Sequence, residues 1–572
     1  MLGLVFVIII AAVLFGLSRL NRYQQEGALT LPGLKEAVTV LRDEKGMAYI
    51  YAKNPDDALM AMGFITAQDR LFQMELTRLF ATGRISDMIG EKGGPLDTRM
   101  RTIGLHRLGK RHAGILDAQT KLFTQKYIDG INAYIKNGSK EHPLEFNLAG
   151  IKPGLWDFPD VLAIMYLMSW NSAANIETEF IAQMLIEKVG LEKAKKIFPL
   201  NINPDDLAPG TALSKTHAHE SSGINLASDQ SLLAYLQDRP LHIGSNNWTT
   251  GPKLSPGGKP ILANDPHLDS RILPGPWYPC GIITSEFRMV GVSIPGIPVI
   301  VVGRNEHIAI GVTNACGDSQ DLYIETLDPK DPNRYLEGDK SLPFEVLCEK
   351  LFIKDKNALD QPAPTIFQAV YREFAFLTFQ DELGQDLALT MLKNWYFWQE
   401  RLKQMVLEGT SPWFDNVLTK DLKETRNALF QQAALAAADK LRASLGKYPK
   451  EWKWGKVHTI EFVSPIRREG FGKGLLGDGP HAFLGSGETL CRGIYEFKDP
   501  FKVTNSASLR MVADLSDDDK VLAVLPGGVS GRFFHPHAKD QIQAFINGDK
   551  MYWWFSDKTI QEHKKTSLLL KP

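Results

Sequence analysis

The sequence predicts an α+β fold, in which helices and strands occupy separate stretches of the chain. Apolar residues recur at helical spacing from about residue 55 to residue 198, and a helical pattern returns over residues 367–446. Short strand-like runs broken by Pro and Gly begin after Ser245 and return from about residue 452 to residue 555. Because these blocks do not alternate one by one, the order favours layered α+β packing over regular βαβ winding.

Residues 1–22 are predicted to form a signal peptide or a membrane anchor. The run from Met1 to Leu17 is uncharged and apolar, and Arg19 and Arg22 follow it. At this length an export signal and a membrane-spanning helix are hard to separate, and no clean A-x-A cleavage site follows. A buried core helix is the less favoured alternative. We therefore expect a periplasmic or otherwise extracytoplasmic protein whose first segment contacts the membrane during export or as an anchor.

Residues 23–200 form the predicted helical part, within which a hairpin precedes the first long helix. Residues 38–53 alternate apolar and polar side chains around a DEKG turn. Asn54 is a good helix N-cap and Pro55 suits the first turn, so a long helix is expected from there until Gly83 ends it.

Residues 201–244 are predicted to be an exposed connector, because periodicity is lost and Pro, Asp, Ser and His gather there. The strand-rich part is assigned to residues 245–572. It opens with WTTGPKL and KPILAND separated by SPGG, which is a hairpin signal.

Composition excludes several classes of protein. The 572 residues contain 65 Lys+Arg and 66 Asp+Glu, so the basic excess of a nucleic-acid-binding protein is missing. Hydrophobic residues make up 44% of the chain, as in globular proteins. The four cysteines are widely spaced without a C-x-x-C pair, which excludes a disulfide scaffold and a zinc signature.

The stretch GSNNWTTG at 244–251 carries the first chemical signal. G-x-S-x-G is absent around Ser245, which excludes the nucleophile elbow of α/β-hydrolases. If the Gly244–Ser245 bond is cut, however, Ser245 carries both a hydroxyl and an α-amine with a pKa of about 7.7–8.0, which suits a general base. Gly244 could adopt the strained geometry that self-cleavage needs. A Gly-Ser dipeptide alone is more often a plain turn.

The context of this dipeptide resembles the penicillin acylase family of N-terminal-nucleophile hydrolases, which includes penicillin, cephalosporin and acyl-homoserine-lactone acylases. The resemblance rests on collinear stretches across most of the chain. They are AYIYAKNPDDALMAMGFITAQDRLFQMELTRLFATGRISDMIG, GSNNWTTG, LANDPHL, PGIPVIVVGRNEHIAIGVTNACGDSQDLYIE, SPWFDNVLTKDLKETR, WKWGKVH, SASLRMVADL and LPGGVSGRFFHPHAKDQ.

The resemblance implies a four-layer αββα sandwich and a set of catalytic residues. Ser245 would be both the self-cleavage residue and the nucleophile, and His267 would tune or orient its α-amine. The alternative for His267 is a surface or core histidine. The backbone N–H of Ala315 would be one oxyanion donor, with Asn314 as a further candidate. Asn264 is expected to hold a turn before His267 rather than to react.

The resemblance also implies a calcium site and an acyl pocket. Asp318 and Asp321 match positions that bind calcium in the family, and Glu177 is the expected third ligand. Carboxylate oxygens suit Ca²⁺, although a solvated acidic turn would give the same pattern. Leu268 and residues 292–300 would line an apolar acyl pocket. No organic cofactor is expected.

One departure from the family pattern bears on activity. A large central block is missing near residues 358–366. In the family it supplies an asparagine that is the second oxyanion donor, a nearby arginine and further calcium ligands. Losing one oxyanion donor costs about 10²–10³ in turnover.

The leading hypothesis is an autoproteolytic amidohydrolase, made as a zymogen, that cleaves linear N-acyl amides through an acyl-enzyme on Ser245. Processing would leave α and β chains that form a heterodimer. A β-lactam side chain, an N-acyl amino acid and an acyl-homoserine lactone all fit as substrates. The alternatives are a degenerate relative that binds amides or a partner with little catalysis, and a sequence truncated internally by error.

Overall fold

The protein is described by a computed structural model. It describes residues 21–137, 141–172, 244–314, 326–348, 351–354, 366–367, 426–466, 473–487, 489–496 and 499–572, together with the single residues 16, 186 and 190.

The described helices lie mostly in the first part of the chain. Two helices dominate, α2 and α6, which pack closely against each other. A Cβ on Gly130 of α6 would stand 2.0 Å from the carbonyl oxygen of Met60 in α2, so this crossing requires glycine. The α-helices are α2 (Pro55–Ala81), α3 (Ser86–Ile89), α4 (Gly94–Ile103), α5 (Leu105–Ile115), α6 (Ala118–Asn137), α7 (Leu144–Ala149), α8 (Phe158–Ser172), α13 (Arg426–Leu445), α14 (Lys473–Leu476), α15 (Ile542–Asn547) and α16 (Asp557–His563).

Two large sheets, one mixed with eight strands and one antiparallel with five, form the centre of the molecule. The eight-stranded sheet has the order β1 (Gly27–Thr30), β22 (Thr566–Lys571), β2 (Val38–Arg42), β3 (Ala48–Tyr51), β6 (Tyr278–Ile283), β7 (Arg288–Ser293), β8 (Val302–Asn305) and β9 (Ala309–Ile310). The five-stranded sheet has the order β21 (Met551–Tyr552), β20 (Val521–Val524), β19 (Arg510–Asp514), β5 (Ile261–His267) and β4 (Gly244–Thr250). Strand β4 is therefore an edge strand.

Smaller sheets complete the described strands. A four-stranded sheet has the order β16 (Asp478–Ala482), β15 (Thr459–Phe462), β18 (Asp499–Ser506) and β17 (Gly493–Glu496). The others comprise β10 (Thr326–Asp328), β11 (Asp331–Glu337) and β12 (Lys340–Pro343), and the pair β13 (Leu347–Cys348) and β14 (Ile366–Phe367).

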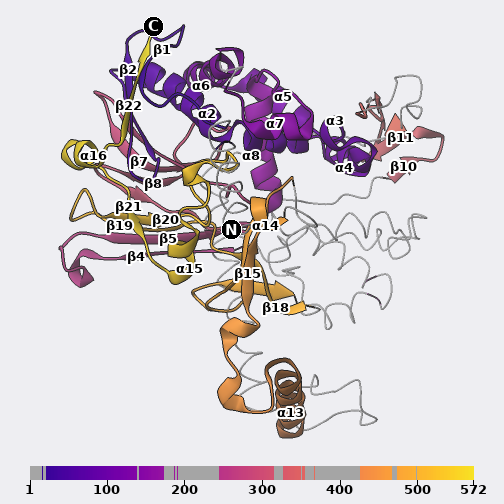
Figure 1. The fold of residues 1–572 in the computed structure, drawn as a ribbon. Helices are drawn as coiled ribbons and strands as arrows, with labels where there is room; N and C mark the ends of the chain where they lie inside the picture. Colours follow the sequence, from indigo (N-terminus) through magenta and orange to yellow (C-terminus); the bar gives the residue numbers. More distant parts are fainter. Residues whose placement is uncertain are drawn as a thin grey trace, which may run out of the picture.

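The layers follow the order helix, sheet, sheet (Figure 1). One hydrophobic core joins α2 and α6 to the eight-stranded sheet and continues to the inner face of the five-stranded sheet. A second core, on the other side of β20, packs Ile542 and Phe545 of α15 against Phe462 of β15 and Val503 of β18. The α+β class is confirmed. In the described residues the fourth layer consists of the short helix α15 and the four-stranded sheet.

Local signals in the sequence correspond to observed elements. The residues around DEKG form the antiparallel pair β2–β3, and those around SPGG form the antiparallel pair β4–β5. The side chain of Asn54 caps α2 by accepting a hydrogen bond from Asp57 N at 2.9 Å, as predicted. Gly83 follows the end of α2 with a left-handed φ of 64°.

The AQDR stretch at 67–70 joins distant parts of the chain. Asp69 forms a buried ion pair with Arg42 at 2.8 Å and accepts hydrogen bonds from the hydroxyls of Tyr23 and Tyr278. Burial alone would raise the pKa of Asp69, but Arg42 and the two hydroxyls outweigh it and hold the pKa below its ordinary value. Arg70 donates to the carbonyls of Gly275, Trp277, Gly528 and Val529. Asp69 therefore links α2 to β2 and β6 of the eight-stranded sheet, and Arg70 links it to the backbone at 275–277 and 528–529.

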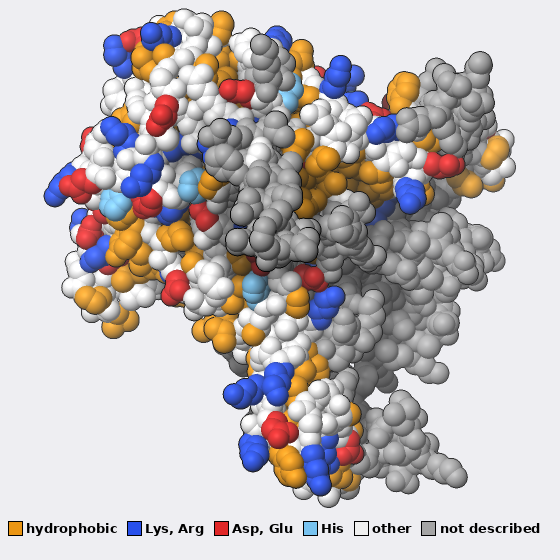
Figure 2. Space-filling model, viewed as in Figure 1, with side chains coloured by type: hydrophobic (Ala, Val, Ile, Leu, Met, Phe, Trp, Pro, Cys, Tyr) orange, Lys and Arg blue, Asp and Glu red, His pale blue; other side chains and the backbone are white. Residues whose placement is uncertain are grey.

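Several predicted segments lie outside the described residues. These are nearly all of the segment 1–22, the connector through residue 243 and the helical stretch 368–425. Among the helices that the structure describes, none is long and apolar enough to cross a membrane. Figure 2 shows Lys and Arg side chains interspersed with Asp and Glu over the coloured part of the visible face, rather than gathered in a basic surface.

Candidate active site

The candidate site lies at the start of β4, where Ser245 is the second residue of the edge strand. Its Oγ donates a hydrogen bond of 2.6 Å to the carbonyl oxygen of Gly244 and accepts one of 3.3 Å from the backbone N–H of His267. The antiparallel register places Gly244 opposite His267 and Ser245 opposite Pro266. The hydroxyl therefore lies against the carbonyl of the bond whose cleavage the sequence predicts.

His267 is fully buried and lies beside this bond. Its Nε2 is 3.2 Å from Oδ2 of Asp265. Because a carboxylate only accepts hydrogen bonds, this contact assigns the ring proton to Nε2 and leaves a lone pair on Nδ1. Nδ1 is buried without a hydrogen-bond partner, and a Cβ built on Gly244 would stand 3.9 Å from it. The structure thus brings Ser245 and His267 together, with a proton acceptor facing Gly244.

Asp265 orients His267, and sequence reasoning missed it. It is 8% exposed and accepts hydrogen bonds from the backbone N–H of Asn246 at 3.2 Å and from Nδ2 of Asn246 at 3.3 Å. Residues two apart on a strand share a face, so the spacing of Asp265 and His267 within NDPH was a usable signal. Asn246, directly opposite Asp265 on β4, was also missed.

The expectation of a turn at Asn264 is wrong. Residues Ile261–His267 form one continuous strand, β5. The Asn264 side chain instead donates to the carbonyls of Asn246 at 2.7 Å and Val312 at 2.8 Å, and its Oδ1 accepts from the N–H of Val312 at 3.1 Å. It therefore fixes residues 312–314 alongside β4.

The expected oxyanion region begins at this junction. The Thr313 hydroxyl donates to the carbonyl of Ser245 at 3.0 Å, so the segment is adjacent to the nucleophile. Nδ2 of Asn314 donates to the carbonyl of Ser172 at 2.7 Å, so an oxyanion donor from Asn314 would have to be its backbone N–H. Ala315 lies outside the described residues.

Gly244 shows no sign of the strain expected from it. Its φ is not among the left-handed values in the described chain, and a Cβ on it would have only ordinary contacts, the nearest 3.7 Å away at Nη1 of Arg492. In the uncut chain the position is therefore not restricted to glycine by backbone strain.

The predicted calcium ligands Glu177, Asp318 and Asp321 all lie outside the described residues. Within the part of the chain that the structure describes, no group of three or more His, Cys, Asp or Glu side chains is arranged to hold a metal.

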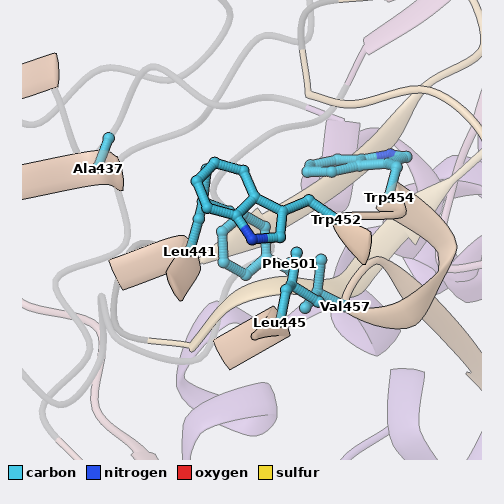
Figure 3. Close-up of a pocket in the computed structure, with 7 residues that line it drawn as sticks. All are labelled: Ala437, Leu441, Leu445, Trp452, Trp454, Val457 and Phe501. Atoms are coloured by element: carbon cyan, nitrogen blue, oxygen red, sulfur yellow. The ribbon is translucent and has the colours of Figure 1, made fainter. Parts of the chain in front are cut away.

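The predicted acyl-pocket residues pack in the main core. Leu268 is partly buried against that core, and Val292 in β7 is fully buried. A separate apolar cavity of about 420 Å³ lies between α13 and the Trp452–Trp454 region, and Figure 3 shows the indole rings and Phe501 around it. No residue predicted for the catalytic site or the acyl pocket lines this cavity. Its lining residues are Ala437, Leu441, Leu445, Trp452, Trp454, Val457 and Phe501.

Together these features define an α+β protein in which a serine at the start of an edge strand lies beside a buried histidine and a carboxylate from the end of the neighbouring strand. The serine hydroxyl already contacts the carbonyl of the preceding peptide bond. The sequence matches the family model described as penicillin amidase over residues 37–359 and 354–562. The chain therefore belongs to the penicillin amidase family, and its membership, expected from the motifs, is confirmed. The two matched segments overlap at residues 354–359, beside the position of the predicted missing block.

Individual relatives cover part of the chain. The acyl-homoserine lactone acylase QuiP of Pseudomonas aeruginosa is 31% identical over 344 residues, which are 58% of this chain and 40% of that protein. The penicillin acylase 2 proenzyme of Pseudomonas sp. strain SE83 is 33% identical over 304 residues, which are 52% of this chain and 39% of that protein. The matched region thus spans about two fifths of the length of these relatives.

Among solved structures, a thermostable penicillin G acylase from Alcaligenes faecalis is similar at 24% identity. The match covers 31% of this chain and 97% of that chain, with a TM-score of 0.26. A score this low adds nothing to the assignment.

Proposed function

We propose that this protein is an amidohydrolase that cuts itself between Gly244 and Ser245 and then hydrolyses linear N-acyl amides through an acyl-enzyme on Ser245. The contact between the Ser245 hydroxyl and the Gly244 carbonyl, with His267 Nδ1 beside it, is the observation that carries the proposal.

Self-cleavage would begin with attack of Ser245 Oγ on the carbonyl carbon of Gly244. The hydroxyl proton passes to Nδ1 of His267, and Asp265 stabilises the resulting imidazolium through Nε2. Collapse of the tetrahedral species breaks the peptide C–N bond, and the proton moves to the amine of Ser245. Water then hydrolyses the Gly244 ester, which frees the Ser245 hydroxyl.

The processed site would use the new α-amine of Ser245 as the general base. This amine takes the proton of the Ser245 hydroxyl as that hydroxyl attacks the amide carbonyl of a substrate, and returns it to the leaving amine. Backbone N–H groups near Thr313, with Ala315 as the expected donor, would stabilise the oxyanion. Water then releases the acyl group as a carboxylic acid.

The relatives support this function over a degenerate binding protein, because the names of both relatives describe acylases and one is called a proenzyme. The test is hydrolysis of a panel of N-acyl amides by the purified protein, with Ser245→Ala as the inactive control. The panel contains phenylacetyl and straight-chain acyl groups on glycine, glycinamide and homoserine lactone. Serine-dependent release of the free amine supports the proposal. No release from any substrate by protein that has cut itself would contradict it.

Calcium binding by Glu177, Asp318 and Asp321 is also proposed, as is an extracytoplasmic location. Elemental analysis of the dialysed protein, compared with an Asp318→Asn variant, tests the metal. Fractionation of cells that express the full chain tests the location.

A further inference from the structure

Arg492 lies beside the Gly244–Ser245 bond although it is far away in the sequence. Its Nη1 would be 3.7 Å from a Cβ built on Gly244. The same loop is held against β4 by Asn246, whose Nδ2 donates to the carbonyl of Leu490 at 3.2 Å. A guanidinium therefore flanks the bond together with His267.

This guanidinium has no anion of its own among the described residues. Its Nε is buried without a hydrogen-bond acceptor, and no carboxylate that the structure describes forms an ion pair with it. Asp265, the acidic side chain of the site, is already engaged by Asn246 and His267.

Of the buried arginines in the described chain, Arg70 and Arg532 donate to carbonyl oxygens and, for Arg532, to the Tyr134 hydroxyl, whereas others pair with carboxylates. Arg42 pairs with Asp69 at 2.8 Å, and Arg78 pairs with Glu75 at 2.7 Å. Arg492 is partly buried, and its Nε is excluded from solvent without an acceptor, a cost that an anionic ligand would remove. A planar fork of N–H donors matches a carboxylate in particular.

We propose that Arg492 binds a carboxylate at the Ser245 site, so that the preferred ligands are N-acyl amides whose amine portion carries a carboxylate. This inference rests on the proposed function. N-Acyl amino acids and the nuclei of β-lactams have such a carboxylate, whereas a homoserine lactone is neutral. A second source has the same chemistry, namely the C-terminal carboxylate of Gly244 that self-cleavage would release.

The test compares ligands that differ only in charge, N-acylglycine and N-acylglycinamide, each with octanoyl and phenylacetyl chains. Binding is measured by calorimetry to the wild-type protein and to uncut Ser245→Ala, each with and without Arg492→Gln. The matched control is Arg271→Gln, because Arg271 follows β5 and is partly exposed beside Asp269. Arg492→Lys retains the charge, and thermal unfolding checks that each variant is folded.

We expect Arg492→Gln to weaken binding of N-acylglycine by about 10- to 100-fold, the range for hydrogen bonds to a charged group, and to leave N-acylglycinamide unchanged. Arg492→Lys should retain part of the preference, and Arg271→Gln all of it. If the uncut protein prefers N-acylglycine to N-acylglycinamide and the cleaved protein does not, the Gly244 carboxylate occupies Arg492 after cleavage. If the processed protein keeps the preference for N-acylglycine, Arg492 binds the carboxylate of the ligand.

The absence of an Arg492-dependent preference in both proteins overturns the proposal, as does an equal loss for both ligands. The outcome is separate from that of the proposed function. Arg492-dependent binding without hydrolysis refutes the amidohydrolase and keeps the carboxylate site. Hydrolysis that does not depend on Arg492 supports the amidohydrolase and refutes the carboxylate site.

Discussion

Asp265→Asn should slow self-cleavage strongly and leave the protein folded. The carboxylate accepts from the N–H and the side-chain amide of Asn246, and it holds the proton of His267 on Nε2 at 3.2 Å. An amide of the same size can keep one of these contacts, but its NH₂ group would face two donors. His267 would then favour the tautomer with its proton on Nδ1, which removes the acceptor beside Gly244.

The size of the effect follows from the loss of a positioned base. General-base catalysis contributes about 10²–10⁴ in rate, so cleavage should slow by at least about 100-fold. The loss in unfolding free energy should be about 1–3 kcal/mol, as for a disrupted buried hydrogen-bond network.

The assay is a time course of full-length precursor and fragments on denaturing gels after synthesis of the protein in a cell-free system. Asp269→Asn is the matched control, because this carboxylate lies four residues after Asp265 and pairs with the partly exposed Arg271. Cleavage of Asp265→Asn at the wild-type rate would refute the reasoning, as would equal slowing by Asp269→Asn.

Three further predictions concern the fold. Asp69→Asn leaves the charge of Arg42 buried and unpaired, so the free energy of unfolding in urea should fall by about 3–5 kcal/mol; a fall below 1 kcal/mol would contradict this estimate. Gly130→Ala should cost at least about 1–3 kcal/mol because its Cβ would meet a carbonyl oxygen at 2.0 Å, whereas Gly114→Ala, with open space around it, should cost nothing in the same measurement. Burial lowers the pKa of His535 to about 3, below its unfolded value near 6.5. The contribution of the neutral ring to the free energy of unfolding is therefore complete above pH 6.5 and is lost as the pH falls. Between pH 7 and pH 5 this loss should be about 2 kcal/mol, and His535→Gln should remove that part of the slope; an unchanged slope would show that the residue does not titrate as described.

The elements that the sequence predicted well are those whose signals are local. The cap at Asn54 and the apolar period after it act within one helix, and the turn residues of SPGG lie between the two strands that they connect. The order of strands in the eight-stranded sheet has no such signal. β22 pairs with β1 and β2 from the opposite end of the chain, and only packing in three dimensions determines this arrangement.

The candidate site likewise combines features that have a local signal in the sequence with features that have none. Ser245 and His267 were found from motifs, and the antiparallel β4–β5 register brings them close by placing Gly244 opposite His267 and Ser245 opposite Pro266. A turn was wrongly expected at Asn264, because Asn-Asp-Pro is a common turn signal. Pairing of β5 with β19 stops at Asn264, so the missing N–H of Pro266 removes no bond from that ladder. The position of Arg492 beside Gly244 had no signal in the sequence, because it depends on how a loop near β17 folds back onto β4.

The most direct test of the central claim is the covalent state of the purified full-length protein. Intact mass and N-terminal sequencing should show two fragments, the second of which begins Ser-Asn-Asn-Trp at Ser245, while Ser245→Ala stays as one chain. A wild-type protein that remains a single folded, uncut chain would contradict the account.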